Sequence, residues 1–156
     1  MPITLYTNPM SRGKIAEWML AEVGVPYEKI DLEYGTSMKS PEFLALNRMG
    51  KVPALVHDGQ VITEAAAICL YLAEAFPDAQ LAPTADERAD YYRWTLFAAT
   101  TLEQGMAFRG SDIVLDDKQK AKLSAQLRKS FHEVTEGVVE IMKSMKAKFP
   151  DPEHVT

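Results

Sequence analysis

Three side chains near the N-terminus are hydrogen-bond donors that lie within a few residues of one another: Tyr6, Asn8 and Ser11. Ser11 directly precedes a segment with helical spacing, and the N-terminal end of a helix carries a partial positive charge. A hydroxyl that donates to the charged form of an acid there favours ionisation of that acid. The same hydroxyl also suits the N-cap of the helix. The two roles are compatible because a hydroxyl both accepts and donates.

The stretch MGKVPALVHDG, which begins at Met49, places a proline directly before an apolar run. Proline cannot donate to a sheet ladder and is confined to strand starts, edges and bulges. Pro53 therefore either only starts a strand or belongs to an X–Pro bond with a special conformation. The cis form of such a bond is accessible, since it costs only about 0.5–1 kcal/mol more than the trans form.

Composition and charge argue against several classes of function. The 156 residues carry a net charge of −5, whereas binding to nucleic acids or anionic membranes depends on clustered Lys and Arg. We expect no membrane span, because no apolar run approaches roughly twenty residues. We also expect no signal peptide, because no basic stretch followed by an apolar one opens the chain.

The cysteine and histidine content points to a reducing, cytoplasmic setting and no metal. The single cysteine, Cys69, allows no internal disulfide, and with three histidines it leaves almost no ligands for a soft-metal site. Cys69 lies in an apolar segment and is expected to be a buried structural thiol. His57, just before a turn signal, is expected at the surface.

The first half of the chain has the pattern of an α/β unit. Strands are expected at Ile3–Thr7 and Tyr27–Leu32, and the helix that starts at Ser11 joins them, so they should be parallel. A short helix follows, with Ser40 as its N-cap and Pro41 at its first position.

A hairpin and a further helix complete this half. The segments ALVHD and QVIT flank Asp58-Gly59, which is a strong hairpin signal. Thr63 is expected to cap the apolar helix EAAAICLYLAEAF. The order βαβ-α-ββα predicts a mixed four-stranded sheet with helices on both faces.

The second half is expected to be all helical. We predict an α/β domain at 1–77, a linker at 78–83 and a helical domain at 84–156. Thr84 and Glu87 have capping-box spacing at the start of the first long helix. A second helical pattern runs from Asp116 to about Lys148, with apolar residues three and four apart.

Three segments together resemble the cytosolic glutathione transferase family: LYTNPMSRGKIAEWMLAEVGVPYE, SPEFLALNRMGKVPALVHDG and ITEAAAICLYLAEAFP. They cover nearly all of the α/β half. The resemblance implies a thioredoxin-like fold, with Pro53 as the cis-proline of the family. It also implies glutathione as a co-substrate.

The resemblance implies roles for residues on each side of the thiol. Val52 would present its backbone N–H and C=O to the cysteinyl part of glutathione, which could pair like an added strand. Ser11 would donate to the glutathione sulfur, with Asn8 and Tyr6 as alternative donors. A thiol at a helix N-terminus ionises more easily, by the logic that lowers cysteine pKa values there.

Charged and helix-terminal groups would hold the two ends of glutathione. Lys51 would pair with the glycyl carboxylate, with help from Lys39, although both lysines could simply be solvated. Glu64 would accept the γ-glutamyl ammonium. The family commonly has Glu-Ser at this point, whereas this chain has Ala65, so one hydroxyl contact is lost while the backbone amide remains.

The helical half is shorter than is usual in the family, and the sequence ends at FPDPEHVT. Two helices alone should leave apolar surface exposed, so we expect a homodimer. The leading hypothesis is a detoxifying glutathione transferase that conjugates glutathione to small hydrophobic electrophiles. The alternatives are a glutathione-dependent disulfide or peroxide reductase and a non-catalytic binding module of the same fold.

Overall fold

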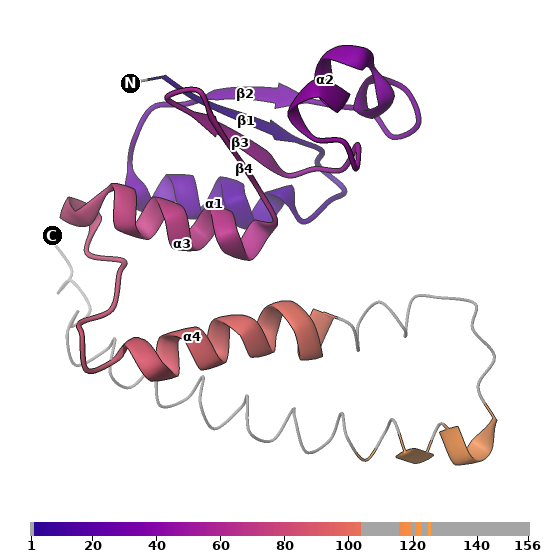
Figure 1. The fold of residues 1–156 in the computed structure, drawn as a ribbon, viewed down its shortest axis with the longest axis vertical. Helices are drawn as coiled ribbons and strands as arrows, with labels where there is room; N and C mark the ends of the chain where they lie inside the picture. Colours follow the sequence, from indigo (N-terminus) through magenta and orange to yellow (C-terminus); the bar gives the residue numbers. More distant parts are fainter. Residues whose placement is uncertain (1, 104–115, 120, 123–124, 126–156) are drawn as a thin grey trace, which may run out of the picture. The chain divides into compact units, whose positions relative to one another are not determined.

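The computed structural model describes residues 2–103, 116–119, 121–122 and 125. The chain divides into two compact units, Met1–Arg93 and Trp94–Thr156. The sheet and the helices that cover it belong to the first unit (Figure 1). None of the helices in the described part of the chain combines the length and the hydropathy that crossing a membrane requires.

Four strands form one mixed sheet in the order β2-β1-β3-β4. Strand β1 (Ile3–Thr7) pairs in parallel with β2 (Glu28–Asp31). On its other side β1 pairs antiparallel with β3 (Ala54–His57), which in turn pairs antiparallel with β4 (Gln60–Thr63). The predicted mixed four-stranded sheet is therefore confirmed, including the parallel pair that the crossover helix requires.

Helices cover both faces of this sheet (Figure 1). Helices α1 (Gly13–Val23) and α3 (Ala65–Ala75) pack against each other on one face. The other face carries α2 (Pro41–Leu46) and the short 3-10 turn η1 (Ser37–Lys39). The core on the α1 and α3 side consists of Ile3, Leu5, Ala16, Leu20, Leu55, Ile68 and Leu72. The core on the α2 side consists of Leu32, Met38, Phe43 and Ala54.

Local sequence signals account for several element boundaries. The Ser40 hydroxyl accepts from the Phe43 N–H over 3.3 Å and caps α2, as predicted. Gly24 ends α1 in the left-handed conformation, with φ 73°. Asp58 and Gly59 have φ values of 51° and 78°, which a two-residue turn of type I′ between β3 and β4 requires.

Two helix starts differ from the prediction. Helix α1 begins at Gly13 rather than at Ser11, with Arg12 at the N-cap position. Thr63 does not cap α3, because it is the last residue of β4 and pairs with Ala54. The N-cap of α3 is Glu64, whose side chain makes no capping hydrogen bond. At α3 the sheet pairing of Thr63 extends up to the residue before the N-cap. At α1 the Ser11 hydroxyl still accepts from the Gly13 N–H, although the helix begins two residues later than predicted.

Beyond the sheet the chain continues through the 3-10 turn η2 (Pro77–Ala79), the helix α4 (Arg88–Leu96) and the π-helical segment η3 (Phe97–Leu102). The Glu87 carboxylate accepts from the Thr84 N–H over 3.1 Å, which is one half of the predicted capping box. Helix α4 itself begins one residue after Glu87.

In the second unit, Asp116 begins a helix as predicted. Its carboxylate accepts from the Gln119 N–H over 2.7 Å, and its own N–H donates to the Gln119 side chain over 3.0 Å. Residues 117–119, 121–122 and 125 are helical. The rest of the helical pattern expected up to Lys148 lies outside the described residues.

Candidate functional site

The register of the sheet brings three loop segments to one end of it. Ala54, the first residue of β3, pairs with Tyr6 near the end of β1 and with Thr63 at the end of β4. The segments that follow β1, precede β3 and follow β4 therefore emerge at the same end of the sheet. These segments carry the predicted site residues Ser11, Val52, Pro53, Glu64 and Ala65.

Ser11 lies beside the first residue of α1. Its hydroxyl accepts a hydrogen bond from the Gly13 N–H over 3.0 Å and donates to the Asn8 carbonyl oxygen over 2.7 Å. The side chain is half-buried. It is thus held at the positive end of a helix, and its proton could be redirected to an anion by rotation about the C–O bond.

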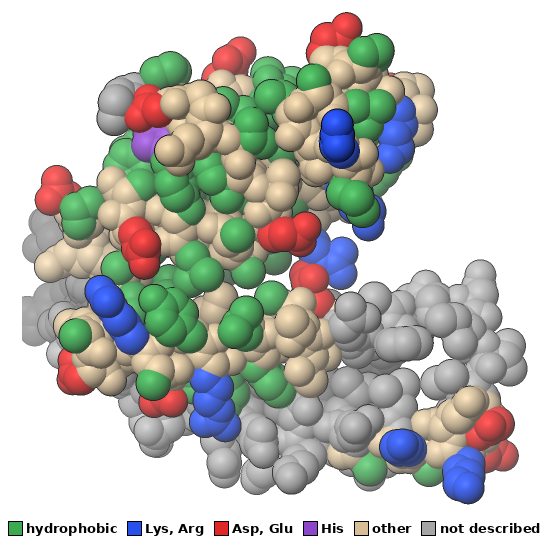
Figure 2. Space-filling view, in the orientation of Figure 1, with side chains coloured by type: hydrophobic (Ala, Val, Ile, Leu, Met, Phe, Trp, Pro, Cys, Tyr) green, Lys and Arg blue, Asp and Glu red, His purple; other side chains and the backbone are tan. Residues whose placement is uncertain are grey.

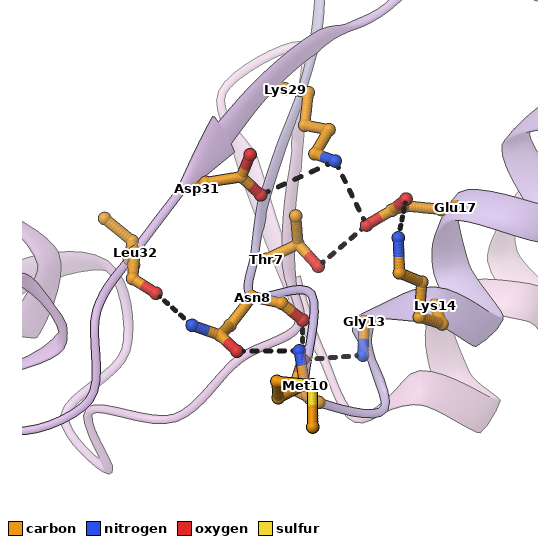
Figure 3. Close-up of polar contacts among 10 residues, drawn as sticks. Thr7, Asn8, Met10, Gly13, Lys14, Glu17, Lys29, Asp31 and Leu32 are labelled. Atoms are coloured by element: carbon orange, nitrogen blue, oxygen red, sulfur yellow. Dashed lines mark hydrogen bonds and ion pairs between the residues drawn. The ribbon is translucent and has the colours of Figure 1, made fainter.

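The two alternative donors make other contacts. The Asn8 amide donates to the Leu32 carbonyl oxygen over 2.7 Å, and its oxygen accepts from the Met10 N–H over 2.9 Å (Figure 3). Asn8 thereby ties the end of β1 to the chain that follows β2. Tyr6 packs its ring against Phe43, with ring centroids 5.6 Å apart, on the α2 side of the sheet. Of the three candidate donors, Ser11 adjoins the start of α1 most directly.

The peptide bond between Val52 and Pro53 is cis, as the family resemblance implied. Pro53 is buried and Val52 is half-buried against the core on the α2 side. Pro53 directly precedes Ala54, where the pairing of β3 begins. The backbone of Val52 therefore lies at the sheet end that also carries Ser11.

The loop before Val52 is held by two side chains. The Asn47 amide donates to the Lys51 carbonyl oxygen over 2.7 Å, and its oxygen accepts from the Met49 N–H over 3.1 Å. The Lys39 ammonium donates to the carbonyl oxygens of Met49 and Gly50, over 3.2 and 3.1 Å. These contacts fix the backbone that leads into the cis peptide bond.

The two predicted lysines therefore differ in their environments. The Lys39 ammonium donates to backbone carbonyl oxygens, which favours a structural role over the predicted contact with a carboxylate. Lys51 is exposed, and its backbone rather than its side chain is tied down by Asn47. Figure 2 shows Lys and Arg side chains near α2 in the first unit, where a carboxylate would meet positive charge.

Glu64 has φ 70° and ψ 122°, a backbone conformation that residues other than glycine rarely adopt. Such strain tends to occur at functional sites. Sequence reasoning gave no sign of it, because a glutamate before a helix is ordinary in composition. The Glu64 carbonyl accepts the first helical hydrogen bond of α3, from the Ile68 N–H over 2.9 Å.

The amides of Ala65, Ala66 and Ala67 form the first turn of α3 and have no partner within the helix. Free amides at a helix N-terminus, together with the helix dipole, form an anion-binding place. Ala65 contributes only its amide here, where a serine would add a hydroxyl.

One polar cluster was missed by the sequence interpretation. The buried Thr7 hydroxyl donates to the Glu17 carboxylate over 3.3 Å, and Lys14 and Lys29 form ion pairs with the same carboxylate (Figure 3). The signal that could have revealed it is a glutamate at position 17, between the core residues Ala16 and Leu20 of an amphipathic helix.

The single cysteine does not belong to this site. Cys69 lies on α3, and burial raises the pKa of its thiol. A thiol with a raised pKa is a poor nucleophile at neutral pH. Among the residues that the structure describes, no three His, Cys, Asp or Glu side chains gather as metal ligands would.

The fold and the site define a class of protein: a thioredoxin-like domain with a cis-proline before its third strand and helix N-termini at the same sheet end. Residues 1–74 match the family model for the N-terminal domain of glutathione S-transferase. Glutathione S-transferase GstA of Escherichia coli O157:H7 is 32% identical over 141 residues, which cover 86% of this chain and 69% of that protein. The chain belongs to the glutathione S-transferase family.

Other relatives support the same family. Glutathione S-transferase F10 of Arabidopsis thaliana is 36% identical over 107 residues, which cover 65% of this chain and 49% of that protein. The chain thus spans about half the length of that relative. A solved structure of a glutathione transferase homologue from Sulfitobacter, with bound glutathione, is 27% identical and has a TM-score of 0.64. That match covers 87% of this chain and 68% of the solved chain.

Proposed function

We propose that this protein binds glutathione, stabilises its thiolate and conjugates it to small hydrophobic electrophiles. One observation carries the proposal: the sheet register directs the segments of Ser11, Val52 and Glu64 to one end of the domain. The solved relative with bound glutathione supports glutathione as the ligand.

Each part of glutathione has a chemically suitable partner in this arrangement. The cysteinyl backbone would pair with the backbone of Val52, beside the cis peptide bond. The γ-glutamyl carboxylate would accept from the amides at the start of α3, and Glu64 would pair with the γ-glutamyl ammonium. The exposed ammonium of Lys51 would meet the glycyl carboxylate.

The reaction begins with loss of the thiol proton to solvent. The N-terminal end of α1 and a hydrogen bond from Ser11 would stabilise the resulting thiolate, because both favour the charged form. A pKa lowered by about two units corresponds to about 2.7 kcal/mol, which a dipole and one or two donors can supply. The thiolate then attacks an electrophilic carbon, and in a substitution the leaving group departs with its bonding electrons.

The surface beside Ser11 suits an apolar acceptor. Met10 is 87% exposed, and the Tyr34 hydroxyl donates to the Met10 carbonyl oxygen over 3.4 Å. Tyr34 is itself 61% exposed. These two large exposed side chains near Ser11 would release ordered water when they contact a hydrophobic electrophile.

A non-catalytic glutathione-binding module is the second candidate. Two observations favour it: the Ser11 hydroxyl donates to the Asn8 carbonyl oxygen, and the first residue of α3 is Ala65, which has no hydroxyl. A glutathione-dependent disulfide or peroxide reductase uses the same thiolate and differs only in the acceptor.

The first test follows the thiolate absorbance of bound glutathione in the ultraviolet as pH rises. We expect the bound thiol to titrate well below free glutathione in the wild type, and close to it in the Ser11→Ala variant. Loss of one donor to an anion should lower the rate of conjugation about 100-fold. Electrophiles and disulfides offered as acceptors then separate the transferase from the reductase.

Ser40→Ala is the matched control for this experiment. It also removes a hydroxyl that accepts a backbone N–H near a helix start, so both variants should lose about 0.5–2 kcal/mol of stability. Only the Ser11 variant should change the thiol titration. Binding without a shifted thiol would favour the non-catalytic module, and no binding at all would overturn the proposal.

The proposal includes a homodimer in the cytoplasm. Several large apolar side chains of the sheet unit are exposed, among them Trp18 at 69% and Met49 at 66%. Exposed apolar surface of this kind marks interfaces when it is contiguous. The molar mass from light scattering tests the dimer, because a monomeric value at micromolar concentration would contradict it.

A further inference from the structure

Helix α1 follows β1 along the chain, and its first residue, Gly13, packs against Thr7, the last residue of β1. Thr7 is fully buried. A Cβ atom on Gly13 would overlap the Thr7 hydroxyl oxygen and would lie 3.0 Å from the Thr7 Cβ atom. Only glycine fits here, so direct contact sets the separation between the first residue of α1 and the last residue of β1.

The Thr7 hydroxyl also forms a hydrogen bond with a side chain from the next turn of α1. It donates to Oε1 of Glu17 over 3.3 Å (Figure 3). Glu17 follows Gly13 by four residues and so lies on the same face of the helix. Thr7 therefore contacts α1 at two successive turns, by packing at Gly13 and by a hydrogen bond at Glu17.

The Glu17 carboxylate is kept ionised by lysines from two elements. Its side chain is 16% exposed, with Lys14 of α1 at 3.0 Å and Lys29 of β2 at 3.5 Å. Lys29 also pairs with Asp31 over 3.5 Å. Burial opposes ionisation of Glu17, but the hydrogen bond from Lys14 and the positive charges of both lysines hold its pKa below the ordinary value. The ionised carboxylate is the form that accepts most strongly from Thr7.

The cluster connects to the candidate catalytic serine through one residue. The Gly13 N–H donates to the Ser11 hydroxyl oxygen over 3.0 Å. Any shift of Gly13 relative to Thr7 would therefore move the group that orients Ser11. A displacement of this kind matters because donors to an anion act only over short, well-aligned distances.

We propose that Thr7, held by Glu17, is a positioning residue that sets the place of the first turn of α1 and thereby orients Ser11 toward the sulfur of bound glutathione. This inference rests on the proposed function. Thr7 does not touch the substrate. Its hydroxyl acts through Gly13 and the first turn of the helix.

The test is the pH titration of bound glutathione in a Thr7→Val variant, which keeps the shape of the side chain and removes the hydroxyl. Loss of one hydrogen bond should raise the apparent pKa of the bound thiol by about half a unit or more. Thr7→Ser restores the hydroxyl and should restore the wild-type titration. An equal shift in both variants would overturn the role of the hydroxyl.

Thr4→Val is the matched control on the same strand. The Thr4 hydroxyl also donates to a glutamate, Glu28, over 3.5 Å, but at an exposed position. Because side chains alternate along a strand, Thr4 and Thr7 face opposite sides of the sheet. The Thr4 variant should leave the thiol titration unchanged, and a shift equal to that of Thr7→Val would contradict the proposal.

A double-mutant cycle identifies the partner of Thr7. In a Glu17→Met background, Thr7→Val should cause no further rise in the thiol pKa, because the acceptor of the hydroxyl is already gone. An undiminished effect of Thr7→Val in that background would exclude Glu17 as the partner.

Amide hydrogen exchange separates failure of this inference from failure of the proposed function. The N–H groups of Lys14 and Ile15 donate to the carbonyl oxygens of Ser11 and Arg12, over 3.4 and 3.0 Å. Thr7→Val should speed their exchange in the ligand-free protein and leave α3 unchanged. If glutathione bound to the wild-type protein titrates as free glutathione does, the proposed function fails. If Thr7→Val leaves the exchange of Lys14 and Ile15 unchanged, the positioning role fails.

Discussion

The Lys39 ammonium donates a hydrogen bond to the carbonyl oxygen of Gly50 over 3.1 Å, three residues before the cis-proline. Gly50 is buried with φ 58°, and a Cβ atom on it would lie 2.6 Å from the Lys39 nitrogen. The glycine thus allows the lysine to approach the backbone closely. This contact links η1 to the loop that presents Val52, and it separates the role of Lys39 from that of Lys51.

Lys39→Met should weaken glutathione binding by loosening the loop before Val52. Loss of hydrogen bonds from a charged group predicts a dissociation constant about tenfold higher. The effect should be the same for glutathione and for glutathione amidated at its glycyl carboxylate, because Lys39 acts on the protein backbone. Calorimetric titration with both ligands measures the two dissociation constants. Weaker binding of unmodified glutathione alone would show that Lys39 contacts the glycyl carboxylate after all.

Lys51→Met should show the opposite selectivity. An exposed ion pair contributes little, so glutathione should bind about twofold to fivefold more weakly. The amidated ligand should bind equally well to the variant and to the wild type, since it lacks the negative charge. Equal weakening of both ligands would show that Lys51 does not contact the glycyl carboxylate.

Ala65→Ser should strengthen glutathione binding. A hydroxyl in the first turn of α3 adds one donor beside the amides that would hold the γ-glutamyl carboxylate, and one hydrogen bond corresponds to about a threefold to tenfold change. Ala75→Ser makes the same change at the exposed last residue of α3, away from these amides, and should leave affinity unchanged. The dissociation constants of the two variants decide the matter.

Glu17→Gln should make the free energy of unfolding depend less on pH in the acid range. The folded-state pKa of Glu17 lies below its ordinary value, so ionisation stabilises the fold above that ordinary value. This contribution is lost as pH falls through the folded-state pKa. The difference between wild type and variant in urea unfolding should therefore be largest near neutral pH and shrink in acid. Glu22→Gln, at an exposed position of the same helix, is the control.

Cys69 should react slowly with an alkylating reagent in the folded protein. Cys69 is half-buried, and burial raises its pKa, which leaves less thiolate at neutral pH. In denaturant the rate should rise to that of a free cysteine thiol. Mass spectrometry follows the reaction cleanly, because the chain holds a single cysteine. A fast reaction in the native state would show that Cys69 is an exposed nucleophile.

Local sequence determined much of the α/β unit. Ser40 with Pro41 specified the start of α2, and Asp58-Gly59 specified the turn of the hairpin, because these residues act through their own backbone conformations and nearest neighbours. Strand and helix order followed from the period of the apolar residues, and the family resemblance added the cis bond at Pro53.

Tertiary contacts decided what those local signals could not. His57, expected at the surface, is 6% exposed and shares a 2.8 Å hydrogen bond with Tyr71 of α3. Lys39, expected near a carboxylate, instead holds backbone carbonyl oxygens of a loop ten residues further along the chain.

The start of α1 shows the reason most directly. Ser11 had the residue type of an N-cap, yet α1 begins at Gly13, where the helix meets the buried hydroxyl of Thr7. Capping preference is a property of a few adjacent residues, so the sequence alone determined that a helix starts near Ser11. Its exact placement depends on how closely the helix can approach a strand, and only the packed structure decides that.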